Sequence, residues 1–327
     1  MIMPKYNIVK FKNMLPLHIG AGRDSYDTAA QFLLSDTVSA ALASIYAQQG
    51  GEDVLDFMNC FTVSSAFPYS GKNYFLPKPL GRLPLGHDVD TLRKQIKKIR
   101  YIDFSVWSDI VTGNELYINE QQLKGEFLVS KEQSNNFVQP YKTTVQQRVA
   151  VPRDGGGDAE PFFFEWKYFE KDAGLFCLFS VDENSGSRLK DMFKCLGESG
   201  IGSDRSVGGG MFDVEFDSIT LPDVADANAL MLLSQYIPTE EELTQVALEE
   251  SRYELVQRGG YMSGSSNAGF RHLINKSIYM FNTASVLKIA QKPTGKVVDL
   301  QPEWNSQGMH PVYRSGRCLA LPIKIID

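Results

Sequence analysis

One glycine-rich stretch, residues 200–210, constrains the fold of this chain more than any other feature of its sequence. Five of its residues are glycine, and Arg205 and Ser206 stand in the middle. Residues 187–196 before it have helical spacing, and residues 211–216 after it alternate as in a strand. Because glycine tolerates positive φ and has no Cβ, the pattern predicts a tight helix–loop–strand connection whose backbone a ligand can approach.

The chemistry of this loop favours an anion as ligand. Several backbone N–H groups can converge on one phosphate, and an Arg adds a bidentate donor. The loop lacks the Gly-Lys-Ser/Thr ending of a Walker loop, and Arg205 stands where a dinucleotide fingerprint needs its last glycine. The sequence therefore gives no motif for ATP, GTP or NAD, and we expect no cofactor. A flexible surface turn is the alternative interpretation.

Composition limits the class of protein. A chain of 327 residues, 43% of them hydrophobic, can bury one large core or two smaller ones, and we expect two domains. The sequence has no apolar run long enough for a membrane span and no signal-peptide core at its N-terminus. Four widely spaced cysteines, with no CxxC or HxxxH spacing, predict free thiols in a reducing cytoplasm and no metal site.

Charge is strongly segregated along the chain, although the net charge is only −6. Residues 1–23, 71–100 and 257–327 carry net charges of +4, +6 and +6, whereas residues 212–254 carry −10. This segregation fits a basic groove for a polyanion, with an acidic surface turned elsewhere. A charged face that serves solubility alone is the competing interpretation.

The order of the predicted elements indicates an α+β fold. Residues 6–11 alternate as a strand, a helix begins near Ser35 or Asp36 as its N-cap, and residues 61–76 form a hairpin. A buried strand at 175–181 and the helix at 187–196 then lead into the glycine loop. This order resembles an elaborated ferredoxin-like fold with its helices on one face of an antiparallel sheet. A second, smaller α+β domain is expected from residue 219 onward.

An insertion of about residues 113–168 interrupts the first domain. Strand-like segments at 145–151 and 162–168 flank an Asp-Gly-Gly-Gly-Asp turn at 154–158. We expect a projecting β-hairpin, with a disordered loop as the alternative.

Catalytic candidates are few. His18 lies in a glycine-bearing loop beside Arg23, where a general base for RNA cleavage could stand. Asp36 and Asp204 could act as acids, but no paired carboxylate or nucleophile motif accompanies either one.

Several segments together resemble one family: residues 17–20, 35–40, 200–210, 275–281 and 310–314. In this order they resemble the RAMP-superfamily subunit of type III-A (Csm) CRISPR effector complexes, which act in antiviral defence. The resemblance runs from about residue 5 to residue 326. It implies two ferredoxin-like (RRM-like) domains, at residues 1–218 and 219–327, with an inserted hairpin.

The resemblance also implies a function. Such a subunit binds RNA without catalysis, holds the 5′ handle of the crRNA, and bridges the large cyclase-type subunit to the backbone RAMP subunits. A single-stranded handle can be held by its phosphates and splayed bases, while base pairing reads the target. The residues expected to contact RNA are His18, Gly20, Gly22, Arg23, Ser35, Arg148, Arg153, Gly200, Gly202, Arg205, Ser206, Gly208, Gly209 and Gly210.

Two other functions stay open on the sequence. The first is a RAMP endoribonuclease that processes precursor crRNA with His18 as base. The second is a protein-only scaffold whose glycine loop contacts a neighbouring subunit.

Overall fold

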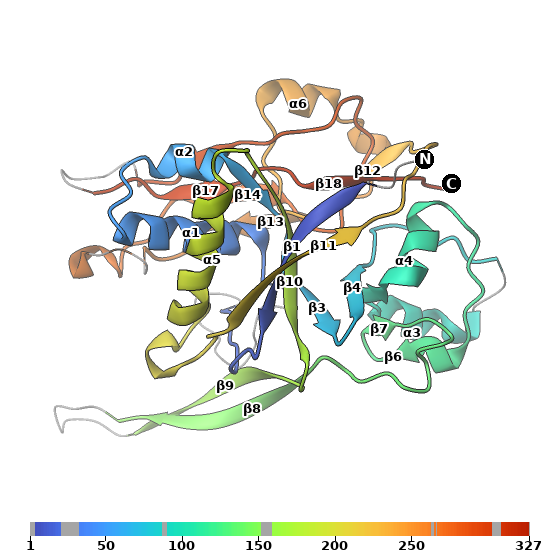
Figure 1. Cartoon of the computed structure of the whole chain (residues 1–327), viewed down its shortest axis with the longest axis horizontal. Helices are drawn as coiled ribbons and strands as arrows, with labels where there is room; N and C mark the ends of the chain where they lie inside the picture. Colours follow the sequence, from blue (N-terminus) through green and yellow to red (C-terminus); the bar gives the residue numbers. More distant parts are fainter. Residues whose placement is uncertain are drawn as a thin grey trace.

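The computed structural model describes residues 4–20, 33–86, 90–151, 159–262, 265, 267–302 and 309–326. Its central feature is a mixed sheet with helices packed on it and a long hairpin that projects from one end (Figure 1). The expected α+β class is confirmed.

The sheet is built on the first strand. β1 (Lys5–Lys12) lies between β10 (Ala173–Val181) and β11 (Asp213–Thr220), and both neighbours are antiparallel to it. The far side of β10 pairs with β2 (Phe61–Val63) and then with β3 (Phe67–Ser70). The strand order β11-β1-β10-β2/β3, with one helix after β1 and one after β10, is that of a βαββαβ unit.

The sheet continues beyond β3 into four further strands between residues 73 and 128. The added strands are β4 (Asn73–Pro77), β5 (Tyr101–Asp103), β7 (Phe127–Leu128) and β6 (Leu123–Lys124). The expected hairpin at 61–76 is confirmed, with β3 and β4 joined at Ser70 and Asn73. Four short helical elements accompany these strands: η1 (Asp90–Leu92), α3 (Arg93–Lys98), α4 (Phe104–Val111) and η2 (Glu120–Gln122).

Two long helices cover one face of the sheet. α1 (Ser35–Gln48) and α5 (Gly186–Ser199) pack on β1 and β10, and α2 (Val54–Asn59) lies beside α1. The sequence predicted that the other face would be free of helices, which is wrong. Ile8, Phe176 and Leu178 on that face join a core with α4 and with strands of the C-terminal half. Both faces of β1 are therefore buried.

The C-terminal half contains mostly short strands. Its three-stranded sheet has the order β15-β12-β18, and β13–β14 and β16–β17 form two separate pairs. Their bounds are β12 (Ala229–Leu232), β13 (Leu255–Arg258), β14 (Ile278–Phe281), β15 (Val286–Leu287), β16 (Val297–Asp299), β17 (Tyr313–Ser315) and β18 (Ala320–Ile323). The acidic segment contains one helix, α6 (Glu240–Gln245), and 3-10 turns follow at Leu248–Glu250 and Ala268–Phe270.

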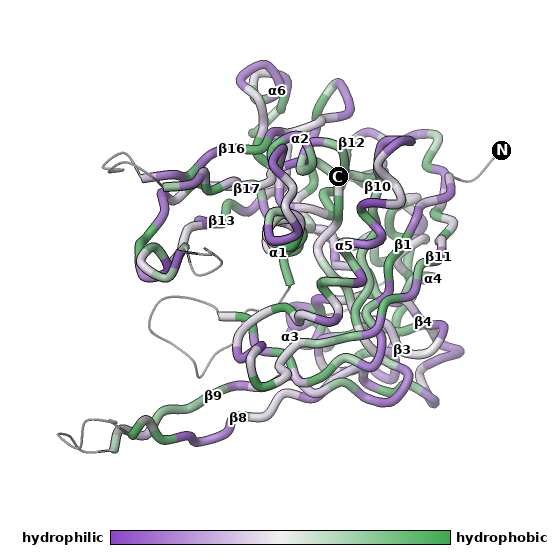
Figure 2. The backbone as a smooth tube through the Cα atoms, turned by 60° about the vertical axis from the view of Figure 1, so that its left-hand side comes forward, coloured by the Kyte–Doolittle hydropathy of each residue, from purple (hydrophilic) through white to green (hydrophobic). Residues whose placement is uncertain are grey.

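The inserted hairpin forms as predicted but is longer. β8 (Tyr141–Ala150) and β9 (Glu160–Phe169) pair from Tyr141–Phe169 outward to Ala150–Glu160. In a second view the hairpin extends away from the body of the protein (Figure 2). The whole Asp154–Asp158 turn, with residues 152 and 153 before it, lies outside the described residues.

Three general features complete the fold. All four cysteines are free thiols. Within the described ranges, no helix combines the length and the apolar character that a membrane crossing requires. The same part of the chain holds no cluster of three His, Cys, Asp or Glu side chains arranged to bind a metal ion.

Candidate nucleic-acid interface

The glycine loop (residues 200–210) is a compact turn between α5 and β11. Its path requires left-handed backbone conformations at Gly200, Gly202, Gly208 and Gly210, with φ between 67° and 92°. Asp204 also has a positive φ, of 57°. Because β-carbons disfavour this region, the spacing of the glycines follows directly from the path of the chain.

The glycines also allow the backbone of the loop to pack on itself and on residues 16–18. A Cβ at Gly210 would lie 1.9 Å from the carbonyl oxygen of Ile201. A Cβ at Gly202 would lie 2.3 Å from the carbonyl oxygen of His18. At Gly208, by contrast, the nearest atom would be 3.7 Å away, on the Leu15 side chain. The base of the loop is therefore tightly packed, and its tip is open.

The predicted convergence of glycine N–H groups on phosphate is wrong for four of the five glycines. The N–H groups of Gly200, Gly208, Gly209 and Gly210 donate to the carbonyls of Leu196, Arg205, Asp204 and Pro16, at 2.8–3.0 Å. These donors close the loop and are not free for a ligand. Any ligand must therefore use other groups, which the tip of the loop supplies.

The loop tip consists of Arg205, Ser206 and Val207, which form a single 3-10 turn, η3. All three residues are exposed, and Val207 keeps 75% of its surface. The side chains of Arg205 and Ser206 make no hydrogen bond or ion pair with the described residues. The tip therefore presents a guanidinium and a hydroxyl to solvent.

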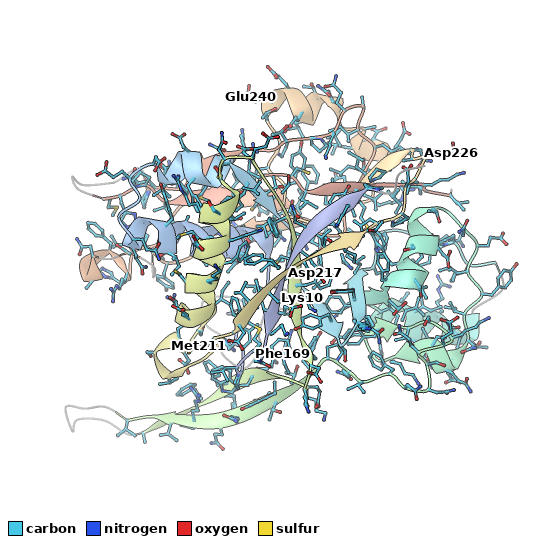
Figure 3. The ribbon with its side chains drawn as sticks, viewed as in Figure 1. Lys10, Phe169, Met211, Asp217, Asp226 and Glu240 are labelled. Carbon is cyan, nitrogen blue, oxygen red and sulfur yellow. The ribbon has the colours of Figure 1, made fainter. Side chains whose placement is uncertain are left out.

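Residues 15–18 connect the glycine loop to the hairpin. On one side, the carbonyls of Pro16 and His18 accept hydrogen bonds from the N–H groups of Gly210 and Ser203. On the other side, Leu17 exchanges two backbone hydrogen bonds of 2.9 Å with Lys167 of β9. Met211, at the end of the loop, and Phe169, at the base of the hairpin, lie toward the same end of the sheet (Figure 3). The structure thus joins three segments that are far apart in sequence.

His18 is placed differently from the sequence expectation. Its side chain is only 1% exposed, and its ring lies 4.1 Å from that of Phe164. Nδ1 lies 2.7 Å from the carbonyl oxygen of Glu165, and Nε2 has no hydrogen-bond partner among the described residues. A buried imidazole cannot reach RNA or abstract a proton from it in this conformation. His18 instead positions the hairpin against residues 15–18.

Arg148 makes the second contact between the hairpin and the loop. Its guanidinium lies 2.6 Å from Asp204 Oδ2 and stacks 4.5 Å above the Phe164 ring. About a third of each of the two charged side chains remains exposed. Asp204 therefore orients Arg148, and the rest of the guanidinium fork faces solvent beside the loop tip.

The inner face of the hairpin carries a signal that the sequence analysis missed. Phe162, Phe164, Trp166 and Tyr168 alternate along β9, so that their side chains point to one face. Phe164 and Trp166 on this face are buried against His18, with ring centroids 4.8 Å apart. The alternation of aromatic residues along β9 was visible in the sequence. The sequence did not show that His18 would pack against them.

The other predicted site residues are dispersed. Gly20 is exposed at the end of a described segment, whereas Gly22, Arg23 and Arg153 lie outside the described residues. Ser35 is 4% exposed, and its hydroxyl both donates to and accepts from Gln235. Its assignment to RNA binding is therefore wrong, because the hydroxyl is buried and already paired.

Asp36 holds two halves of the chain together. It is fully buried, and its carboxylate accepts from Arg258 Nε at 2.8 Å and from Arg314 NH1 at 2.5 Å. Burial opposes its ionisation, but the two guanidinium groups outweigh this effect and lower the pKa of Asp36. It is neither the predicted acid nor the N-cap, which is Leu34. We name Asp36, Arg258 and Arg314 the buried ion cluster.

The acidic segment does not face away from the basic ones throughout, as the charge pattern suggested. Lys10 and Lys12 of β1 pair with Glu215 of β11 at 3.1 and 2.6 Å. The two strands are neighbours, so the first basic segment is partly neutralised by the acidic one.

Comparison with known proteins supplies the family. A family model described as the CRISPR Csm4 C-terminal domain matches residues 225–323. The chain is 29% identical over 300 residues to the CRISPR system Cms protein Csm4 of Mycobacterium tuberculosis, covering 88% of this chain and 89% of that protein. It is 27% identical over 273 residues to the protein of the same name from Thermococcus onnurineus, covering 80% and 82%.

Solved structures share the fold. A chain of the Csm3-Csm4 subcomplex of the type III-A CRISPR-Cas interference complex matches with a TM-score of 0.66 at 17% identity, covering 98% of this chain and 100% of that one. A chain of the Csm1-Csm4 cassette in complex with cA4 matches with a TM-score of 0.65 at 21% identity, covering 99% and 100%. In the domain model that matches its C-terminal part, in the sequences related to most of its length and in its fold, this chain is therefore similar to the Csm4 proteins of type III-A CRISPR systems.

Proposed function

We propose that the chain is an RNA-binding subunit of a type III-A interference complex that anchors the 5′ handle of the crRNA. The observation that carries this proposal is the meeting of the loop tip with Arg148 of the hairpin. Arg205 and Ser206 are exposed there, and Arg148 is held beside them by Asp204 and Phe164. Two guanidinium forks and a hydroxyl suit the phosphates of a single strand.

In this arrangement, the groups that hold the loop in shape are not the groups that contact the ligand. The glycine backbone sets the shape of the loop through internal hydrogen bonds, and the side chains of its tip meet the ligand. Phosphate contacts of this kind fix the position of a strand and do not read its sequence. Recognition of the target is then left to base pairing with the guide.

The hairpin would contact the guide where the handle meets the spacer. Its outer face carries exposed Val145, Val149 and Phe163, which keep about half of their surfaces. An apolar wedge of this kind can displace a base from a stack. Shortening residues 152–159 to a tight turn is expected to leave the protein folded and assembled but to weaken protection of the first spacer nucleotides. An unchanged nuclease footprint at this junction would contradict the placement.

The partners follow from the family. One of the similar solved structures is a Csm1-Csm4 cassette, and the other is a Csm3-Csm4 subcomplex. We propose that this chain likewise bridges a cyclase-type large subunit and a backbone RAMP subunit. Its domains would be ferredoxin-like units at residues 1–218 and 219–327. The βαββαβ order of the first unit and the family match from residue 225 support this division.

The proposed role includes no catalysis by this chain. The sequence alternative, an endoribonuclease with His18 as base, is disfavoured by the burial of that ring between Phe164 and Trp166. A cleavage assay of the purified chain on repeat RNA, without added metal, tests this point. Cleavage by the native chain that His18→Gln abolished would overturn the proposal.

Native purification is the decisive experiment for RNA binding. The chain should bring down a guide RNA and the other complex subunits, and ultraviolet crosslinking should map its contact to the 5′ handle. Crosslinks confined to the loop tip and hairpin are expected. Recovery of the partner subunits with no crosslink to RNA would favour the protein-only scaffold instead.

A further inference from the structure

The outer half of helix α3 consists of basic side chains. Successive residues of a helix are about 100° apart, so Arg93, Lys94, Lys97 and Lys98 share one arc of about 140°. All four are exposed, whereas Ile96 on the opposite side packs against the core. The helix therefore presents a convex surface with four charges of one sign. We name these four residues the basic face of α3.

The cations of the basic face have no counterion among the described side chains, and none of them forms a side-chain hydrogen bond there. Two carboxylates at the border of the helix have other partners. Glu126 pairs with Arg100 at 3.2 Å, and Glu120 accepts from the Gln95 amide at 3.1 Å. Residues 90–100 as a whole carry five basic side chains and one acidic one. The excess positive charge of α3 is therefore available to an external partner.

Helix stability does not explain this pattern. The basic face contains two pairs of like charges four residues apart, Arg93 with Lys97 and Lys94 with Lys98, and such pairs destabilise a helix. Arg93 and Lys94 also lie in the first turn, where the helix dipole disfavours positive charge. The charges are thus present although they oppose folding, which indicates that they serve binding.

Helix α5 shows the pattern expected of a face that only keeps the protein soluble. Its exposed Lys194 pairs with Asp191, three residues before it, at 3.1 Å. Surfaces that serve solubility usually mix both signs of charge in this way. No acidic residue is interspersed along α3. The comparison separates the basic face from an ordinary solvated helix.

The basic face is remote from the loop tip. α3 leads into β5, and the glycine loop leads into β11 at the other end of the central sheet. Five strand-to-strand steps of about 4.8 Å separate these two strands, roughly 24 Å in all. Figure 1 shows α3 beside β6 and β7, with β3 and β4 between it and α5. This surface is therefore distinct from the proposed RNA interface and does not rest on it.

We propose that the basic face of α3 binds the phosphate backbone of double-stranded DNA. The major groove of B-form DNA, about 12 Å wide, admits a helix, and cations at both edges of the arc can then reach phosphates of both strands. The major groove of A-form RNA is too deep and narrow for this. A single strand fits less well, because α3 has no aromatic side chain on which bases could stack.

A protein partner also fits this surface less well than DNA does. Lysine is depleted in protein–protein interfaces, and three of the four residues of the basic face are lysines. A duplex, by contrast, supplies a dense row of phosphates, and each cation that neutralises one releases a condensed counterion. Binding should therefore weaken steeply with salt and depend little on sequence.

Fluorescence anisotropy of the full-length chain, freed of RNA, with a short labelled DNA duplex of mixed sequence tests the proposal. The double variant Lys94→Gln/Lys97→Gln should weaken binding at low salt by about tenfold and reduce the slope of log affinity against log salt by about two. Lys190→Gln/Lys194→Gln, which removes two exposed lysines of α5, is the matched control and should bind as the native chain does.

The α3 variant should remain folded, because each of its substitutions relieves one pair of like charges. It should unfold thermally at a temperature no lower than the native chain. A salt slope unchanged by the α3 variant, or an equal loss in the α5 control, would overturn the proposal. So would the absence of duplex binding at low salt.

Competition identifies the occupant. Unlabelled duplex DNA should displace the probe, whereas duplex RNA of the same sequence, either single strand and polyglutamate should compete poorly. Equal competition by any of these three would contradict DNA as the partner. Native purification of the α3 variant should still recover the other complex subunits, and their loss would show that α3 is a protein interface instead. Failure of handle binding at the loop tip would leave these expectations unchanged.

Discussion

Two junctions join distant parts of this chain, and they differ in how far they exclude water. The buried ion cluster places Asp36, at 0% exposure, between Arg258 and Arg314. The hairpin junction pairs Asp204 with Arg148 while a third of each side chain stays exposed. Both are Asp–Arg contacts, but the first connects helix α1 to the C-terminal half and the second orients a surface arm. The same pair of residue types can thus be structural or functional, depending on burial.

The sharpest test of this contrast is removal of each carboxylate. Asp36→Ala should lower the free energy of unfolding by about 3–5 kcal/mol, because the two partly buried guanidinium groups lose their fully buried counterion. Asp204→Ala should cost less than about 1 kcal/mol, because solvent screens that pair. Chemical denaturation of both variants measures the difference. Equal losses would show that burial does not distinguish the junctions.

A second comparison lies within the glycine loop. Gly210→Ala should destabilise the protein by about 3 kcal/mol, since it adds a left-handed backbone penalty of about 1–2 kcal/mol to overpacking against Ile201. Gly208→Ala meets no close atom and should cost only the backbone penalty of about 1–2 kcal/mol. Thermal unfolding of the pair separates the two contributions, and equal shifts in Tm would mean that the base of the loop can relax.

The buried ion cluster should also leave a signature in pH. The pKa of Asp36 is lowered in the folded state, so the unfolded state takes up its proton first as the pH falls. The stabilisation is complete above the unfolded pKa, about 3.9, and is lost as the pH falls through the folded value. Asp36→Asn should reduce the loss of unfolding free energy that denaturation curves show as the pH falls from about 5 to 2. If the dependence of the unfolding free energy on pH were unchanged in this variant, other carboxylates would be responsible for the loss of stability in acid.

Arg148 should matter modestly for stability and more for the ligand. Arg148→Ala removes an ion pair that is one third exposed and a stacking contact on Phe164, together about 1 kcal/mol. Arg148→Lys keeps the charge but loses the planar fork. Compared with Arg148→Ala, it should therefore recover more of the protein's stability than of its protection of RNA. Nuclease footprinting of assembled complexes checks this. Full protection with the lysine variant would mean that charge alone suffices.

The loop tip should show the smallest effect on folding. Arg205→Ala is expected to change the free energy of unfolding by less than about 0.5 kcal/mol, because the side chain is exposed and forms no hydrogen bond or ion pair with the described residues. Under the proposed function it should weaken handle binding by about 1–3 kcal/mol. Arg188→Ala, at an exposed arginine on α5, is the control. If Arg205→Ala left the RNA affinity unchanged, the loop tip would not be part of the RNA interface.

Local pattern was enough for much of this fold. The glycine spacing predicted the helix–loop–strand connection, alternation predicted β1, and an apolar run predicted β10. Both arms of the hairpin were also predicted as strands. These elements depend on backbone conformation and on the period of apolar residues, which neighbouring residues determine. The similarity to Csm4 proteins was likewise visible in a few short segments, since they are read in order along the chain.

Burial and pairing depended on residues far apart in sequence. Whether His18 faced RNA or Phe164 was decided by where the hairpin folds back, 147 residues later. Asp36 finds its partners 222 and 278 residues away, and Ser35 is paired with Gln235. A side chain's chemistry is fixed by its sequence, but its solvation and counterions are fixed by which distant segments pack beside it. For that reason the sequence alone determined the loop and the resemblance to Csm4 proteins, and only the tertiary structure decided which polar groups remain free to bind.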